Sequence, residues 1–303
     1  MNAEFIETND IRLAYDRFGA PTDPAILLVA GLGTQMIRWT DAFCQHLASR
    51  GLQVIRFDNR DAGLSTHLWD AQAPDLGAIA RSLAQGVVPT VPYSLADMAA
   101  DTVSLLDGLG IPRAHLAGRS MGGMIAQLVA STYPERVRSL TSIMSSSGNP
   151  ALPPASPETM ALMTRPAPDP RAAPDAYVQH SLEFARHIAG SGSRVDDEAY
   201  RALIMEEARR GYDPGGFARQ LAAIAVDGDR RSRLATIAAP SLVIHGTEDP
   251  LFPPAHGIDT AAAIPGAMLM TIEGMGHDLP PVLNARIIDA IIATIERAES
   301  TTP

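Results

Sequence analysis

The chain has 303 residues, of which 46% are hydrophobic and 19% charged, and 34 acidic against 24 basic side chains give a net charge of −10. This length and apolar content are typical of a globular protein with a large core, and they exclude a disordered chain and a disulfide-stabilised miniprotein. The acidic balance argues against nucleic-acid binding, which draws much of its affinity from basic side chains on phosphates.

Two residue types limit the chemistry further. All basic side chains are arginine, so lysine-based covalent catalysis is excluded, and the single cysteine, Cys44, excludes an intrachain disulfide and a paired-cysteine metal site. Charged residues interrupt the N-terminal segment, which is unlike a signal peptide, and no run approaches the roughly 20 apolar residues of a membrane span. We therefore expect a cytoplasmic protein with no membrane span and no metal.

Short apolar runs alternate along the chain with segments of helical periodicity. Phe5–Thr8 and Ile11–Phe18 flank the turn dipeptide Asn9-Asp10 and predict a hairpin. Further strands are predicted at Ala25–Val29, Leu52–Phe57, Ala114–Ala117, Leu140–Met144, Ser241–His245 and Ala267–Ile272, and helices at Ser94–Leu109 (with Ser94 as N-cap), Met121–Tyr133 and Val282–Ala298. This alternation predicts an α/β fold, with a mostly parallel central sheet and helices on both faces.

Residues 149–233 break this alternation. The segment begins rich in proline and continues with helical patterns at Tyr177–Ile188 and Asp196–Arg210, without an evident strand. We predict a helical cap or lid here, inserted into an α/β core that residues 1–148 and 234–303 form together. Ligands of such a core bind beyond the carboxyl ends of the strands.

The motif Gly118-Arg119-Ser120-Met121-Gly122 lies between a predicted strand and a predicted helix. This is the G-x-S-x-G pattern of a nucleophile elbow, in which glycines allow a turn too tight for a β-carbon. A plain strand-to-helix turn is the alternative interpretation. We predict that Ser120 is a nucleophile, which needs a histidine base and an acid that orients it.

The expected chain order is serine, acid, histidine. Two carboxylates, Glu248 and Asp249, follow the strand Ser241–His245, and Asp249 is favoured because Pro250 fixes its turn. Of the eight histidines, His277 alone lies on a glycine-rich loop after a strand, whereas His245 lies inside a strand and is expected to pack in the core. The sequence therefore predicts Ser120, Asp249 and His277 as a catalytic triad.

An acyl-transfer enzyme also needs backbone donors for the oxyanion. We predict the N–H groups of Met121, at a helix N-terminus, and of Leu32, in Gly31-Leu32-Gly33 after the strand Ala25–Val29. The same loop lacks a full G-x-G-x-x-G motif, because Met36 stands in the sixth position, so no dinucleotide cofactor is expected.

Taken together, the elbow, the acid loop and the histidine loop resemble the α/β-hydrolase superfamily over nearly the whole chain. The loop 58–65 resembles the pattern D-x-R-G-x-G-x-S with Asp61 in place of glycine, and Val29-Ala30-Gly31-Leu32 resembles the usual HG-x loop with Ala30 in place of histidine. These departures and the segment 274–280 resemble the subgroup that contains aclacinomycin methylesterase.

That resemblance implies a cofactor-free serine esterase that cleaves a small-molecule carboxylic ester, which we expect to be apolar, through an acyl-enzyme intermediate. The serine nucleophile argues against epoxide hydrolases and haloalkane dehalogenases, which use aspartate. The same triad also serves C–C hydrolases, acyltransferases and perhydrolases, and the same fold includes slow-turnover receptors, so these remain alternatives.

Overall fold

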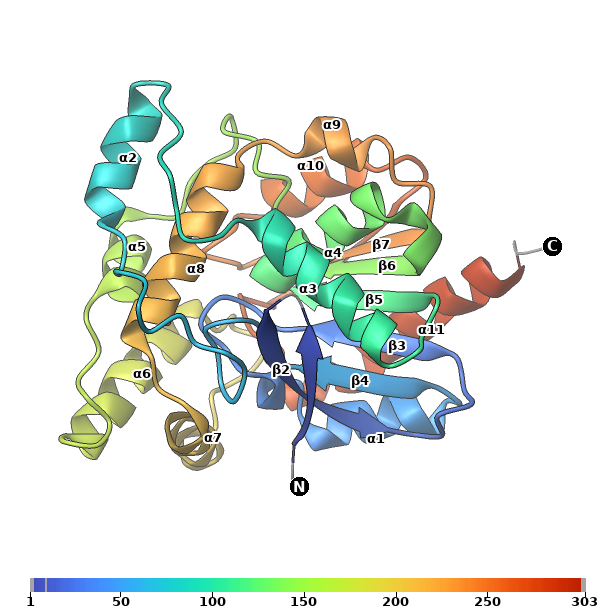
Figure 1. The fold of residues 1–303 in the computed structure, drawn as a ribbon, viewed down its shortest axis with the longest axis horizontal. Helices are drawn as coiled ribbons and strands as arrows, with labels where there is room; N and C mark the ends of the chain where they lie inside the picture. Colours follow the sequence, from blue (N-terminus) through green and yellow to red (C-terminus); the bar gives the residue numbers. More distant parts are fainter. Residues whose placement is uncertain (1–2, 9, 301–303) are drawn as a thin grey trace.

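A computed structural model describes residues 3–8 and 10–300 and is built around one eight-stranded sheet (Figure 1). The strand order is β1-β2-β4-β3-β5-β6-β7-β8; β2 runs antiparallel to both β1 and β4, and the remaining neighbours are parallel. The strands are β1 (Glu4–Thr8), β2 (Ile11–Phe18), β3 (Ala25–Val29), β4 (Gln53–Phe57), β5 (Ala114–Arg119), β6 (Val137–Ile143), β7 (Ser241–Gly246) and β8 (Met268–Ile272). The predicted α/β fold with a mostly parallel sheet is confirmed.

Strand positions agree with the predicted apolar runs, but some ends differ. Strand β5 continues through Arg119, because this polar residue pairs with Ile143 in the ladder. Strand β6 begins at Val137, three residues earlier than predicted. The predicted turn residue Asn9 lies outside the described residues, and Asp10 after it has a φ of 62°.

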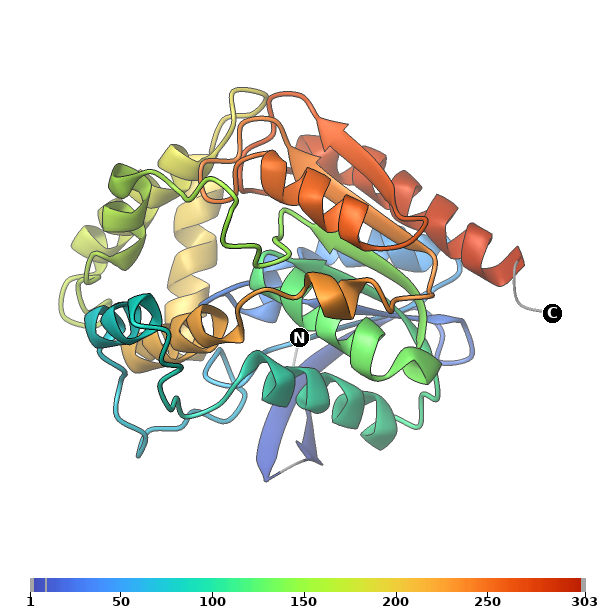
Figure 2. The ribbon, with the colours of Figure 1, turned by 90° about the horizontal axis from the view of Figure 1, so that it is seen from above.

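Helices cover both faces of the sheet (Figure 2). They are α1 (Asp41–Ser49), α2 (Leu76–Ala84), α3 (Leu95–Gly108), α4 (Met121–Thr132), α5 (Pro157–Thr164), α6 (Pro174–Ile188), α7 (Asp197–Arg210), α8 (Pro214–Asp227), α9 (Arg231–Leu234), α10 (Ala255–Ala263) and α11 (Asn284–Ser300), with 3₁₀ turns at Met36–Arg38, Pro134–Arg136 and Pro281–Leu283. The predicted N-cap of α3 is confirmed: the Ser94 hydroxyl accepts from the Asp97 N–H in a capping box. Among the described residues, no helix is both long and apolar enough to cross a bilayer.

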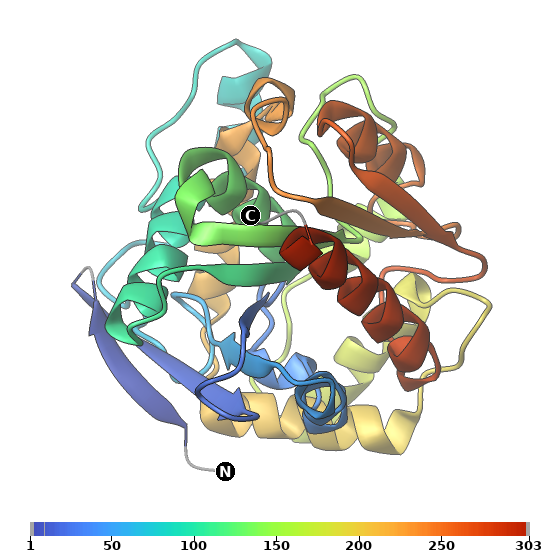
Figure 3. The ribbon, with the colours of Figure 1, turned by 90° about the vertical axis from the view of Figure 1, so that its right-hand side faces the viewer.

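The two faces of the sheet carry separate apolar clusters, as a strand's alternating side chains require. In β3, Leu27 and Val29 pack with α3 and α4, whereas Ile26 and Leu28 pack with α1 and α11. Figure 3 shows α1 and α11 side by side on their face of the sheet. This double coverage explains why the five residues of β3 are all buried and read as one continuous apolar run.

Helices α5 to α9 stand between β6 and β7 in the chain, and α5 to α8 gather at one end of the molecule (Figures 1 and 2). Helices α6 and α7 have a small apolar cluster of their own around Val178, Leu182 and Ile204. Hydrogen bonds from α7 and α8 reach the loop that follows β3. These helices therefore lie over the edge where β3 and β5 end, which is the edge that carries Ser120.

Candidate active site

Ser120 lies on a strained turn between β5 and α4. Its φ of 54° and ψ of −122° are unusual for a residue with a side chain. A β-carbon at Gly118 would lie 2.1 Å from the carbonyl oxygen of Gly122, and one at Gly122 would lie 2.2 Å from that of Val29. Both glycines of the motif are therefore required by backbone approach, as in a nucleophile elbow.

The three residues predicted to form a triad come together. His277 Nδ1 lies 2.7 Å from Asp249 Oδ2, and His277 Nε2 lies 2.9 Å from Ser120 Oγ. An ionised carboxylate can only accept, so Nδ1–H donates to Asp249, and Nε2 of the neutral ring accepts the Ser120 hydroxyl proton. The His277 main chain is also held, because its N–H donates to Ile188 O at 2.8 Å.

Asp249 is buried and ionised. Burial is the largest influence and opposes the charge, but His277 and the Phe252 N–H together outweigh it and hold the pKa of Asp249 below its ordinary value. Its Oδ1 accepts from the N–H groups of Leu251 at 2.9 Å and Phe252 at 2.8 Å, which leaves Oδ2 facing His277. The carboxylate therefore presents one oxygen to the ring in a fixed direction.

Glu248 and His245 make their hydrogen bonds with other residues, although His245 Nε2 also lies 3.6 Å from Asp249 Oδ2. Glu248 is exposed, and its carboxylate accepts from the Ser191 N–H at 2.6 Å and hydroxyl at 2.7 Å. His245 is buried in β7, as predicted, with Nε2 2.7 Å from Phe252 O, and burial lowers its pKa and favours the neutral ring. In the described part of the chain, Ser120 Oγ is hydrogen-bonded to the His277 ring alone.

The loop after β3 packs directly against the elbow. A β-carbon at Gly31 would lie 3.3 Å from Ser120 Cβ. Along this loop the N–H groups of Gly33, Thr34, Gln35 and Met36 all donate to oxygen atoms, at 2.8, 3.3, 3.3 and 2.7 Å. By contrast, the Leu32 N–H has no acceptor among residues 3–8 and 10–300.

Met121 is the first residue of α4, where an N–H has no partner within the helix. Met121 directly follows Ser120 in the chain, and Leu32 directly follows Gly31, which lies against Ser120. Donors at a helix N-terminus are suited to binding negative charge, because the helix dipole is positive there.

Sequence reasoning missed the contacts that fix the Gly31–Gly33 loop from outside. The Gln220 side chain of α8 accepts from the Gly33 N–H at 2.8 Å, and Glu207 of α7 accepts from the Gln35 N–H at 3.3 Å. Phe217 of α8 packs on Gly33, where a β-carbon would lie 2.7 Å from its ring. These partners are 172 to 187 residues from the loop in sequence, so no local pattern could have identified them.

The departure from the family pattern at Asp61 is also explained by helix α8. Asp61 has a φ of 64°, and its carboxylate accepts two hydrogen bonds of 2.8 Å from Arg219 and one of 2.7 Å from Tyr93. Asp61, His67 and Asp213 offer oxygen and nitrogen atoms within 4.8 Å of one another, as a metal site would. However, the Arg219 guanidinium already lies between both carboxylates, so this cluster is an ion-pair network.

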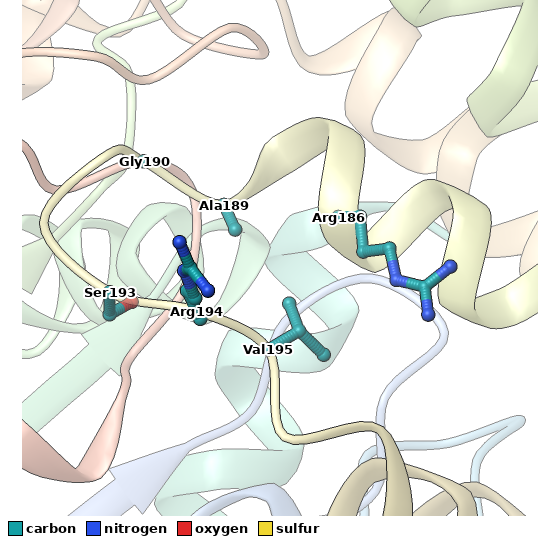
Figure 4. A pocket seen from close by; sticks show the side chains of 6 residues that line it. All are labelled: Arg186, Ala189, Gly190, Ser193, Arg194 and Val195. Atoms are coloured by element: carbon teal, nitrogen blue, oxygen red, sulfur yellow. The ribbon is translucent and has the colours of Figure 1, made fainter.

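A cavity of about 290 Å³ opens beside the segment that joins α6 to α7 (Figure 4). Its lining comes from Arg186, Ala189, Gly190, Ser193, Arg194 and Val195. This segment touches the histidine loop, because a β-carbon at Gly190 would lie 2.0 Å from Gly274 O. The cavity is therefore a neighbour of the Ser120 site, and its lining contains none of the three triad residues.

Comparison with known proteins agrees with this fold. A family model described as the alpha/beta hydrolase fold matches residues 24–281. Rhodomycin D methylesterase of Streptomyces peucetius is 29% identical over 97% of this chain and 98% of its own, and a putative carbamate hydrolase of Variovorax paradoxus is 31% identical over 80% of each. The enol-lactonase of Burkholderia xenovorans superposes with a TM-score of 0.71 at 22% identity, covering 98% of this chain and all of its own. The methylesterase resemblance expected from the sequence is confirmed.

Proposed function

Because the chain belongs to the alpha/beta hydrolase fold family, we propose that it is a serine esterase that hydrolyses carboxylic esters of small molecules. The observation that carries this proposal is the His277 ring, which lies between Ser120 Oγ at 2.9 Å and the Asp249 carboxylate at 2.7 Å. This is the arrangement by which a weak hydroxyl nucleophile is activated. That the protein is a hydrolase agrees with what the sequence predicted.

The first half of the reaction acylates Ser120. His277 Nε2 takes the hydroxyl proton while Oγ attacks the ester carbonyl, and the Asp249 carboxylate stabilises the imidazolium that forms. The Leu32 and Met121 N–H groups bind the oxyanion, and each such donor is worth about 3–4 kcal/mol in the transition state. His277 then protonates the alcohol, which leaves as the C–O bond breaks.

Deacylation uses the same groups. His277 takes a proton from water, which attacks the acyl-enzyme, and the carboxylic acid leaves as Ser120 recovers its proton. No cofactor enters either half-reaction.

The substrate proposal is a carboxylic ester with an apolar body. A methyl ester is the first to test, because the methylesterase relative matches along 98% of its length. We further propose that residues 149–233 form a cap over the site. Two observations support this. Helices α5 to α9 lie between the neighbouring strands β6 and β7 in the chain, and α7 and α8 contact the loop beside Ser120.

The test compares the wild type with Ser120→Ala on a methyl ester of an apolar carboxylic acid and on a series of p-nitrophenyl esters from acetate to long chains. Loss of Ser120 should lower kcat by about 10⁵- to 10⁶-fold, because a triad acts as a unit. A fluorophosphonate probe should label Ser120 in the wild type alone. Retained turnover in Ser120→Ala would refute the proposal, whereas labelling of Ser120 without ester turnover would favour C–C cleavage, acyl transfer, perhydrolysis or a receptor role.

A further inference from the structure

We infer that Gln220, on helix α8, is a positioning residue that holds the Gly31–Gly33 loop so that the Leu32 N–H serves the oxyanion. This inference rests on the proposed function, since it concerns the same site. No hydrogen bond joins Gln220 to Ser120 in the described structure, and the action of Gln220 passes through the main chain of Gly33.

Hydrogen bonds fix the Gln220 side chain at both ends. Its Oε1 accepts from the Gly33 N–H at 2.8 Å, and its Nε2 donates to Arg60 O at 2.8 Å. The second bond determines which end of the amide faces the loop, because a carbonyl oxygen can only accept. The side chain is fully buried, so water does not replace either partner if the amide is removed.

The position of Gly33 determines that of Leu32. Gly33 has a φ of 63°, and its N–H belongs to the peptide plane that follows Leu32, so binding that N–H fixes the rotation of the loop. Phe217, one turn before Gln220 on α8, packs on the same glycine. Because Gly31 also lies against Ser120, a small displacement of Gly33 moves the Leu32 donor relative to the nucleophile.

Helix α8 is itself held firmly. Arg219, the residue before Gln220, makes paired hydrogen bonds with Asp61, and a further one of 2.6 Å with Asp213. The Arg60 guanidinium is paired with Asp101. Both arginines beside Gln220 therefore pair with carboxylates, and the Gln220 amide supplies an uncharged donor and acceptor between them.

The test is Gln220→Met, which keeps the length of the side chain and removes both hydrogen bonds. Gln127→Met is the matched control, because Gln127 is also 0% exposed and bonds Ser142 and Arg230 at a distance from the loop. For Gln220→Met we expect kcat to fall roughly tenfold to a hundredfold, less than loss of a whole oxyanion donor, with KM within about threefold. The control should keep kcat within about threefold of the wild-type value. Its Tm should fall by about as much as the Tm of Gln220→Met.

Two further readouts separate positioning from folding. The rate at which a fluorophosphonate labels Ser120 should fall with kcat, and this needs no knowledge of the natural substrate. In Gln220→Glu, the introduced carboxyl can replace both bonds only when protonated, so its kcat relative to wild type at the same pH should rise as pH falls. This variant also serves if Gln220→Met fails to fold.

The inference is overturned if Gln220→Met keeps kcat and labelling rate within about threefold of the wild type, or if Gln127→Met loses as much. A pH-independent ratio for Gln220→Glu would also count against it. Failure of the proposed function itself is recognised separately, by activity that survives in Ser120→Ala.

Discussion

Replacing Asp249 with asparagine tests the triad at its most buried point. Asp249 Oδ1 accepts from two backbone N–H groups at 2.8 and 2.9 Å, so the asparagine carbonyl must take this place and its NH₂ must face His277 Nδ1. The ring then carries its proton on Nε2, where it cannot accept the proton of Ser120. The amide is held in the unproductive direction by the same bonds that fix the carboxylate.

The size of the effect follows from those bonds. Turning the amide around leaves two partly buried N–H donors unpaired at about 1–3 kcal/mol each, or about 2–6 kcal/mol in total. Since each 1.36 kcal/mol is a factor of ten, this slows turnover by roughly 30-fold to 10⁴-fold. Loss of the negative charge beside the imidazolium adds to it, so we expect kcat to fall by about 10⁴-fold with KM little changed.

The assay is steady-state hydrolysis of a p-nitrophenyl ester with the wild type, Asp249→Asn and Glu248→Gln. The last is the matched control, because Glu248 is the adjacent carboxylate and is exposed. Thermal unfolding shows whether each variant is folded. If Asp249→Asn kept more than a tenth of the wild-type kcat, or if Glu248→Gln lost as much, the assignment of the acid would be refuted.

Three other variants probe the fold. Gly118→Ala should lower the unfolding free energy by about 3 kcal/mol or more and abolish activity, because its β-carbon would meet Gly122 O at 2.1 Å. Urea unfolding and ester assays measure these two effects, and a stable, active variant would contradict the prediction. Arg219→Met should lower the unfolding free energy by about 3–5 kcal/mol, because it leaves the Asp61 carboxylate without its ion-pair partner. Adding Asp61→Asn should restore part of that free energy, and no recovery in the double variant would contradict the pairing. Burial lowers the pKa of His115 to about 4. Between pH 6.5 and about 4 the unfolded chain therefore binds a proton that the native ring does not, and the unfolding free energy decreases as the pH is lowered through this range. His115→Gln should make that fall shallower in urea titrations at each pH, and an unchanged slope would contradict the assignment.

Features with a local cause could be predicted from the sequence. The elbow follows from glycines beside Ser120, and the strands follow from apolar runs that pack on both faces. Helices α2 and α8 were not predicted, although Asp75 caps α2 by accepting from the Ala78 N–H and Pro214 lies in the first turn of α8, which are ordinary helix-start signals. The glycines in these first turns weaken the helix propensity, and the burial of Ile79 in α2 and of Ala223 in α8 compensates for it.

No local sequence pattern indicated the long-range polar contacts. Nothing near Gln220 in sequence indicates a partner 187 residues away, and Asp61 appeared only as a departure from a pattern. A buried polar side chain in a helix looks the same as an exposed one until the opposing surface is known. The proposed triad could be predicted because the fold fixes the chain order of its members, whereas the groups that position the Gly31–Gly33 loop follow no such order.

The two proposed oxyanion donors differ in whether local or long-range contacts position them. The Met121 N–H is continuous with the nucleophile, and the glycines of the elbow leave it little freedom of its own. By contrast, the Leu32 N–H lies on a loop whose other donors are held by α7 and α8. If the Leu32 N–H binds the oxyanion as proposed, a substitution in these helices changes the geometry of that donor without moving Ser120, His277 or Asp249. On this proposal, the cap at residues 149–233 tunes the rate of the chemical step as well as the fit of the substrate.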